Sequence, residues 1–300
     1  MRIFRIAVGE SQVLQKALIL EVEAKQVKKI AGYWTAVLLV IIYLWVSNEV
    51  ARGNLIFDVG PIAAVPLLET CWHYAILLLL TLFFPFIASF DKRIDYFSKW
   101  PEFFKAALPV ALLFILWDVW FTKIGVWGFN ADYFSGITLL GLPWEEWAFF
   151  FVIPFSCLFI YESVRYFYPG ISFGKYDRPI TLGLAILFLT IGFAKWSALY
   201  TATTFLLSGF FCLYHFLFMP RAMAWRGTFY LSYLLSWIPF LLINGSLTGS
   251  FTSQPVVVYN PAEYLGIRVG TIPLDDSVYS FLLLFSVTTL YEFYLRKRKV

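Results

Sequence analysis

The chain has 300 residues, of which 60% are hydrophobic, 21% are aromatic and only 14% are charged. This composition excludes a conventional soluble domain, because too few charged residues remain to cover its surface. The net charge of +4 needs no nucleic acid to explain it. We therefore expect the lipid bilayer as solvent and predict no nucleic-acid partner.

Apolar segments recur along the whole chain, and eight of them approach the roughly 20 residues that a spanning helix needs. In order, the predicted helices are Ile30–Ser47, Trp72–Phe90, Phe104–Phe121, Trp147–Arg165, Pro179–Ala194, Ala198–Met219, Thr228–Asn244 and Ser277–Tyr294. The predicted fold class is therefore all-α, a polytopic membrane helical bundle.

Basic residues predict the orientation of this bundle. If the amino terminus is cytoplasmic, all but four of the 23 lysines and arginines lie on the cytoplasmic side. The four on the other side are Arg52, Lys123, Lys195 and Arg268. We expect a multi-pass protein of the cell membrane with a cytoplasmic amino terminus.

Cofactor-binding patterns are missing from the sequence. The two histidines, His73 and His215, are too few for the imidazole clusters of membrane iron enzymes. No GxGxxG motif follows a strand-like segment, as a flavin or nicotinamide domain would require. Cys71, Cys157 and Cys212 lack a spacing that indicates a disulfide framework or a zinc site. We predict no cofactor and no metal.

An internal repeat becomes visible when the sequence is shifted by 130 residues against itself. The aligned features are Pro109/Pro239, Asn130/Asn260, Gly136-Ile137/Gly266-Ile267, Pro143/Pro273, Glu145-Glu146/Asp275-Asp276 and Tyr161-Glu162/Tyr291-Glu292. We predict two parallel three-helix repeats, 73–167 and 203–297, joined by a linker helix within 168–202. Residues 1–70 form an added segment with one membrane helix.

Two acidic pairs begin equivalent helices on the face that is poor in basic residues. Glu145-Glu146 and Asp275-Asp276 each follow a proline, where negative charge also suits the helix dipole. Adjacent helical residues point about 100° apart, so the two acids of a pair have different surroundings. A carboxyl group inside an apolar bundle is costly, which favours a function for these residues.

Three further acids have separate interpretations. Asp118 is expected at the depth of the acidic pairs, although pairing with Asn130 or a helix end would explain it equally well. Glu162 and Glu292 lie at the opposite face, where we interpret them as partners of the basic helix ends. The candidate catalytic residues are thus Asp118, Glu145, Glu146, Asp275 and Asp276.

Aromatic side chains surround the acidic pairs and could stabilise a carbocation by about 1–2 kcal/mol for each desolvated ring. Aromatic belts at membrane interfaces give the same pattern, and for any single ring the belt is the simpler interpretation. The candidate substrate-binding residues are Trp117, Trp127, Asn130, Trp144, Trp147, Asn260 and Tyr279.

The two acidic motifs resemble those of a known family. Phe121–Asn130, followed by Gly136-Ile137 and Leu142–Phe150, is similar to the first domain of the heterodimer-type lycopene cyclases of bacteria, archaea and fungi. Leu265–Asp276 is similar to the second domain, so both domains would be fused in one chain. Residues 1–70 have no counterpart in the family pattern.

The resemblance implies a lycopene β-cyclase, an isomerase (intramolecular lyase) of carotenoid biosynthesis without net redox change. A general acid would protonate the terminal double bond of lycopene or a related linear carotenoid. The C5=C6 bond would attack the resulting cation, and a base would then remove a proton from C6. Glu145 or Glu146 with Asp275 or Asp276 would serve as acid and base, in an order that the sequence leaves open.

Three other functions compete with this one. A proton-coupled transporter would need polar residues across the bundle, but the helices after the acidic pairs offer only Ser156, Ser280, Ser286, Thr288 and Thr289. A rhodopsin-like protein would need a lysine within the last helix. A non-catalytic carotenoid-binding subunit would have the same apolar pockets with aromatic linings, so the sequence does not separate it from the enzyme, which we favour; the oligomeric state is left open.

Overall fold

The helices follow the apolar segments of the sequence. The computed structural model describes residues 55–56, 59–170, 173–219 and 224–298. Its α-helices in these ranges are α2 (His73–Ala88), α3 (Trp100–Ile124), α4 (Trp144–Phe167), α5 (Asp177–Ala194), α6 (Leu199–Phe218), α7 (Ala224–Leu247) and α8 (Leu274–Arg298). The all-α prediction is confirmed, and the predicted helix Ile30–Ser47 lies outside the described residues.

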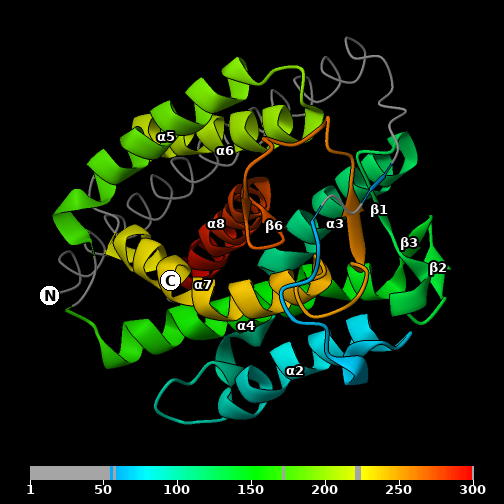
Figure 1. Cartoon of the computed structure of the whole chain (residues 1–300). Helices are drawn as coiled ribbons and strands as arrows, with labels where there is room; N and C mark the ends of the chain where they lie inside the picture. Colours follow the sequence, from blue (N-terminus) through cyan, green and yellow to red (C-terminus); the bar gives the residue numbers. More distant parts are fainter. Residues whose placement is uncertain (1–54, 57–58, 171–172, 220–223, 299–300) are drawn as a thin grey trace, which may run out of the picture. The chain divides into compact units, whose positions relative to one another are not determined.

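Six of these helices, all except α2, are long and apolar enough to cross a membrane. α2 has 16 residues, a rise of about 24 Å against a hydrocarbon core of roughly 30 Å. It is therefore shorter than a straight spanning helix, contrary to the prediction of eight similar spans. α5 and α6 are separate helices, as predicted, and lie side by side (Figure 1).

The internal repeat is evident in the order of the elements. Helices α2, α3 and α4 correspond to α6, α7 and α8 after a shift of 130 residues, and α5 is the linker. The connections repeat as well. Each contains a strand and a short hairpin: β1 (Trp127–Phe129), β2 (Thr138–Leu139) and β3 (Leu142–Pro143), matched by β4 (Val257–Tyr259), β5 (Arg268–Val269) and β6 (Ile272–Pro273).

These short strands were not predicted, because their pairing depends on residues far apart in the chain. β1 and β4 pair antiparallel, with Gly128 opposite its equivalent, Val258. A side chain at Gly128 would force the Leu55 side chain to shift, since a Cβ there would lie 2.6 Å from Leu55 Cδ1. Equivalent residues facing each other across antiparallel strands define a local twofold axis between the repeats.

The opposite end of the bundle shows the same exchange of partners. The Tyr161 hydroxyl donates to Glu292 at 2.8 Å, and the equivalent Tyr291 hydroxyl donates to Glu162 at 3.0 Å. Lys99 lies 2.7 Å from Glu162, and Arg165 lies 2.8 Å from Glu292. The prediction that both glutamates partner basic helix ends is confirmed.

Candidate active site

The first acid of each pair holds the loop that precedes its helix. Glu145 Oε1 accepts a hydrogen bond from the Ser135 backbone N–H at 2.9 Å. The equivalent Asp275 accepts from the Leu265 N–H at 3.1 Å and from the Thr201 hydroxyl at 2.6 Å. Both acids are fully buried. Glu145 and Asp275 therefore fix the position at which α4 and α8 begin.

The residue after Ser135 and the residue after Leu265 are both glycines with positive φ, Gly136 at 84° and Gly266 at 82°. A non-glycine residue would be strained in this left-handed conformation. The glycine turns the chain so that the Ser135 and Leu265 N–H groups reach the acids. The recurring spacing between glycine and acidic pair is thus a feature of local structure.

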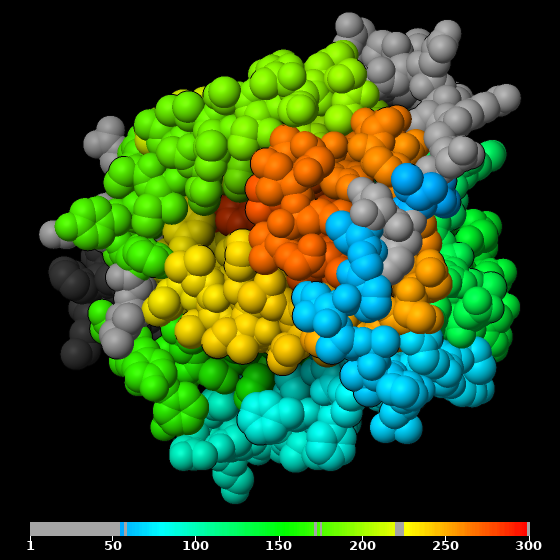
Figure 2. Space-filling model, viewed as in Figure 1, coloured from blue at the N-terminus to red at the C-terminus, as the bar shows by residue number. Residues whose placement is uncertain are grey.

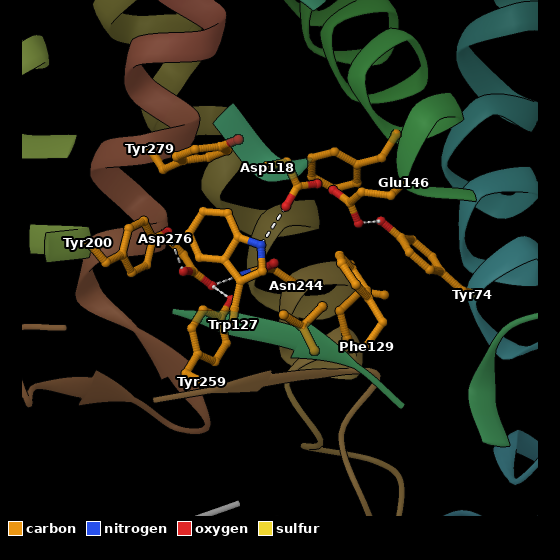
Figure 3. A pocket seen from close by; sticks show the side chains of 13 residues that line it. Tyr74, Asp118, Trp127, Phe129, Glu146, Tyr200, Asn244, Tyr259, Asp276 and Tyr279 are labelled. Carbon is orange, nitrogen blue, oxygen red and sulfur yellow. Dashed lines mark hydrogen bonds between the residues drawn. The ribbon is translucent and has the colours of Figure 1, made fainter. Parts of the chain in front are cut away.

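The second acids point into one shared pocket. Glu146 and Asp276 are offset by one residue from the loop-holding acids, so the helix turns them toward the local twofold axis. Asp118 on α3 joins them (Figure 3). The complete lining is Tyr74, Asp118, Trp127, Phe129, Glu146, Phe149, Tyr200, Asn244, Leu247, Val257, Tyr259, Asp276 and Tyr279.

Asp276 is surrounded by neutral hydrogen-bond donors. Its oxygens accept from the Tyr200 hydroxyl at 2.7 Å, the Asn244 amide at 2.8 Å and the Tyr259 hydroxyl at 2.8 Å. Burial, and then the charge of Asp276, raise the pKa of Tyr259 well above its usual value, so this hydroxyl keeps its proton. Three donors suit an ionised carboxylate, which can only accept hydrogen bonds.

Glu146 and Asp118 have a different environment. Glu146 Oε2 accepts from the Tyr74 hydroxyl at 2.6 Å, and Asp118 Oδ1 accepts from the Trp127 indole N–H. The two carboxyl groups face each other in the pocket, and Asp118 Oδ2 has no hydrogen-bond partner among the described residues (Figure 3). Two carboxyl groups this close cannot both ionise readily, so they suit a shared proton.

Aromatic rings enclose the space between the two sets of acids. The Trp127 ring lies edge-on to the Tyr200 ring, with 4.9 Å between centroids, and to the Tyr279 ring at 6.1 Å. Tyr200 and Tyr259 are stacked at 6.1 Å. Ring faces of this kind attract a cation. The cavity has a volume of about 60 Å³, room for roughly two water molecules.

The structure brings together only some of the residues singled out in the sequence. Asp118, Trp127, Glu146, Asp276 and Tyr279 line the pocket, whereas Glu145 and Asp275 contact the loops beside it. Asp118 accepts a hydrogen bond from Trp127 and not from Asn130, one of the two structural partners considered for it in the sequence.

Five other candidates lie outside the lining. The Asn130 side chain accepts a hydrogen bond from the Asp132 backbone N–H, and the Asn260 side chain accepts one from the Ala262 backbone N–H. The two asparagines thereby stabilise equivalent turns. The Trp144 and Trp147 indoles donate to Ser135 and to the Leu139 carbonyl. Trp117 packs on Tyr279, with ring centroids 5.1 Å apart. A direct substrate contact of these five residues stays a prediction.

Sequence reasoning missed Tyr74, Tyr200, Asn244 and Tyr259. The repeat held a signal for Tyr259, since its equivalent is Phe129 and both line the pocket close to Trp127. The residues equivalent to Tyr74, Tyr200 and Asn244 are Thr204, Thr70 and Phe114, and none of these lines the pocket. Only the packing of α2, α6 and α7 reveals the three pocket residues.

Fold and site together define a helical membrane protein with an internal repeat and a carboxyl-lined pocket between its halves. The sequence model of the family described as lycopene cyclase matches residues 70–164 and 197–294, which is more than half of the chain. The chain therefore belongs to the lycopene cyclase family. No curated protein and no solved structure was found to match it. The two matched regions each contain one acidic pair, as expected for two fused domains.

Proposed function

We propose that this family member is a lycopene β-cyclase that closes β-ionone rings by proton transfer, without net redox change. One observation carries the proposal. The equivalent acids Glu146 and Asp276, from the two repeats, meet with Asp118 in one pocket lined by aromatic rings. A proton-initiated cyclisation needs a general acid, a general base and a means of stabilising a cation between them.

The different environments of the acids support a division of the two proton-transfer roles. The facing pair Asp118 and Glu146 holds the proton that is added to the terminal double bond. The resulting cation is attacked by the C5=C6 bond, which forms the ring bond and moves the positive charge to C5. The Trp127 and Tyr279 rings stabilise this charge.

Asp276 then takes the C6 proton, and the C–H electron pair forms the ring double bond. Tyr200, Asn244 and Tyr259 hold Asp276 in position for this step. One proton enters the substrate and one leaves it, so the product is an isomer and no redox cofactor is needed. Return of a proton to the Asp118–Glu146 pair completes the cycle. Glu145 and Asp275 position the helices that carry the reacting acids.

The proposal is tested by expressing the full chain in a bacterial host that accumulates lycopene. We expect pigments of unchanged mass with one or two β-rings, identified by chromatography with absorption and mass detection. Rings of another type would overturn the β assignment. Persistent lycopene, with the protein shown to be in the membrane, would overturn lycopene as the substrate.

For variants that replace a pocket acid by its amide, the matched control is Asp132→Asn. Asp132 is an exposed acid in the loop after β1. The control should give the wild-type pigment pattern, which shows that removal of an acid at this face is not harmful by itself.

A further inference from the structure

A second cavity lies deeper in the bundle, between α2, α4, α7 and α8. It has a volume of about 390 Å³. Its lining is Leu80, Thr81, Phe84, Pro85, Ile153, Ser156, Cys157, Phe159, Ile160, Tyr233, Ser236, Trp237, Pro239, Phe240, Leu242, Ile243, Ser280 and Leu284. We call this cavity the apolar groove.

The hydroxyl groups in the apolar groove are already satisfied by backbone carbonyls. Thr81 donates to Leu77 at 2.7 Å, and Ser156 donates to Thr81 at 3.0 Å. Ser236 and Ser280 donate to carbonyls three residues earlier on their own helices. The groove therefore offers a polar solute few free hydrogen-bonding groups. A hydrocarbon suits it better than an ion or a sugar.

The apolar groove opens toward lipid between α2 and α7. Its lining residues Leu80 and Phe84 on α2 are 64% and 68% exposed, and Leu242 on α7 is 58% exposed. α4 is visible between α2 and α7 in the space-filling view (Figure 2). A molecule dissolved in the bilayer could enter sideways along this seam without crossing water.

The groove and the acidic pocket are neighbours along three helices. On α7, Ile243 lines the groove and the next residue, Asn244, lines the pocket. On α8, Ser280 lines the groove and the preceding residue, Tyr279, lines the pocket. On α4, Ile153 lies seven residues beyond Glu146, about 10 Å along the helix axis.

An apolar wall separates the two cavities. Phe149, Val152 and Ile243 pack against the cluster that contains Tyr74, Leu77 and Leu247. Phe149 and Leu247 also line the pocket, and Ile243 also lines the groove. These side chains must move when the end of a substrate enters the small pocket.

We propose that the apolar groove binds the polyene chain of the substrate while one of its ends lies in the acidic pocket. This inference rests on the proposed function for its substrate, a linear apolar polyene. The groove supplies apolar contact along the chain, and the Phe149 wall is the passage from groove to pocket. The exposed seam between α2 and α7 is the route of entry from the membrane.

The groove has no open equivalent at the twofold-related position between α3, α4, α6 and α8, all of which lie in the described part of the chain. Thr81, Pro85, Tyr233 and Ser280 have Phe211, His215, Phe103 and Phe150 as equivalents, all of them buried. The Phe211 and His215 rings are in contact, with centroids 4.8 Å apart. Large rings thus fill the corresponding space. With a single groove for the polyene chain, only one end of one substrate molecule can lie in the acidic pocket at a time. Each binding event would therefore close one ring.

The test narrows the groove with the double variant Leu80→Trp/Leu242→Trp. Its matched control is Leu79→Trp, because Leu79 neighbours Leu80 on α2, is 66% exposed and does not line the groove. Each is made both in the wild-type chain and in the inactive background Asp276→Asn. Ring formation is measured in the first, and lycopene retained per mole of purified protein is measured in the second.

We expect the double variant to lower both ring formation and lycopene retention by about tenfold, the effect of roughly 1.4 kcal/mol of lost binding, and Leu79→Trp to change neither. Wild-type ring formation and retention in the double variant would overturn the groove proposal while leaving the cyclase intact. No ring formation in the wild-type chain would instead overturn the proposed function. Retention that still depends on Leu80 and Leu242 would then support a polyene groove without catalysis.

Discussion

The two repeats share one scaffold but differ in the acids and donors that they bring to the pocket. The first repeat contributes two facing carboxyl groups, Asp118 and Glu146, with one donor each. The second contributes the single carboxyl of Asp276 with three donors. The repeat thus places two acids in equivalent positions, and their neighbours differ, as the proposed roles of proton donor and proton acceptor require.

The difference is clearest on the equivalent helices α3 and α7. Asp118 corresponds to Thr248, whose hydroxyl donates to the Asn244 carbonyl at 2.9 Å and does not line the pocket. One turn earlier, Phe114 corresponds to Asn244, which donates to Asp276. Each helix therefore carries one polar pocket residue, an acid in α3 and an amide in α7.

Among the neighbours of Glu146 and Asp276, the largest effect is expected from Asp118, where the facing pair is broken. Asp118→Asn leaves Glu146 without its acidic neighbour and should lower ring formation by about 10²-fold, the range of a lost general acid. Thr248→Asn, at the equivalent position of the other repeat, should leave at least a third of the activity, roughly the effect of a minor packing change. Initial rates of pigment conversion in isolated membranes measure both. Equal losses would contradict the different roles of the two helices.

A smaller loss is expected from removal of the donors around Asp276. Tyr259→Phe removes one of three hydrogen bonds to a charged group, each worth about 1.5–3 kcal/mol; because two donors remain, we expect the lower end of this range, a fall in rate of roughly tenfold. Tyr200→Phe should behave alike. In the Tyr259→Phe background, the second change Phe129→Tyr adds a hydroxyl at the equivalent position of the first repeat. We expect that it does not restore the rate. Restoration by this change would mean that the hydroxyl acts from either side.

The loop-holding acids should affect stability before chemistry. Asp275→Asn disturbs hydrogen bonds from Leu265 and Thr201, and Glu145→Gln disturbs the one from Ser135. We expect a loss of about 1–3 kcal/mol in the free energy of unfolding for each, with the larger loss for Asp275→Asn. Thermal unfolding of the purified protein in detergent checks the order. A larger loss for Glu145→Gln would show that the Thr201 contact adds nothing.

The smallest effect concerns Glu69, outside the long helices. The Tyr133 hydroxyl, followed by the Ser253 backbone N–H at 2.6 Å, lowers the pKa of Glu69 below its usual 4.5. Its contribution to stability is therefore present above pH 4.5 and is lost as the pH falls through the lower folded value. Glu69→Gln should therefore lower the melting temperature slightly near neutral pH, and its difference from the wild type should shrink on the acid side, where the wild-type carboxyl is also neutral. A difference that does not shrink on the acid side would contradict the assignment.

The fold was largely predictable because apolar run length and an ungapped repeat are both local signals. The position of each acidic pair at a helix start, and the basic partners of Glu162 and Glu292, followed from the same patterns, although α4 and α8 begin three residues before the predicted Trp147 and Ser277. The pairing of β1 with β4 was not predictable, since each strand has only three residues and its partner lies in the other repeat.

The site was predictable in part for a related reason. Consecutive acids at a helix start could be found in the sequence, but both are buried, and only the loop contacts show which acid of each pair faces the pocket. Tyr74 and Tyr200 reach the pocket from α2 and α6 through helix packing, which leaves no periodic trace in the sequence. Their roles follow from the assembled bundle alone.

The central claim is that Glu146 and Asp276, one from each repeat, are the proton-transferring groups. The most direct measurement is ring formation by Glu146→Gln and Asp276→Asn in lycopene-containing membranes, with each variant shown to be inserted at the wild-type level. The account predicts that either amide alone abolishes ring formation, although the other acid is intact. Rings formed at the wild-type rate by both variants would contradict it.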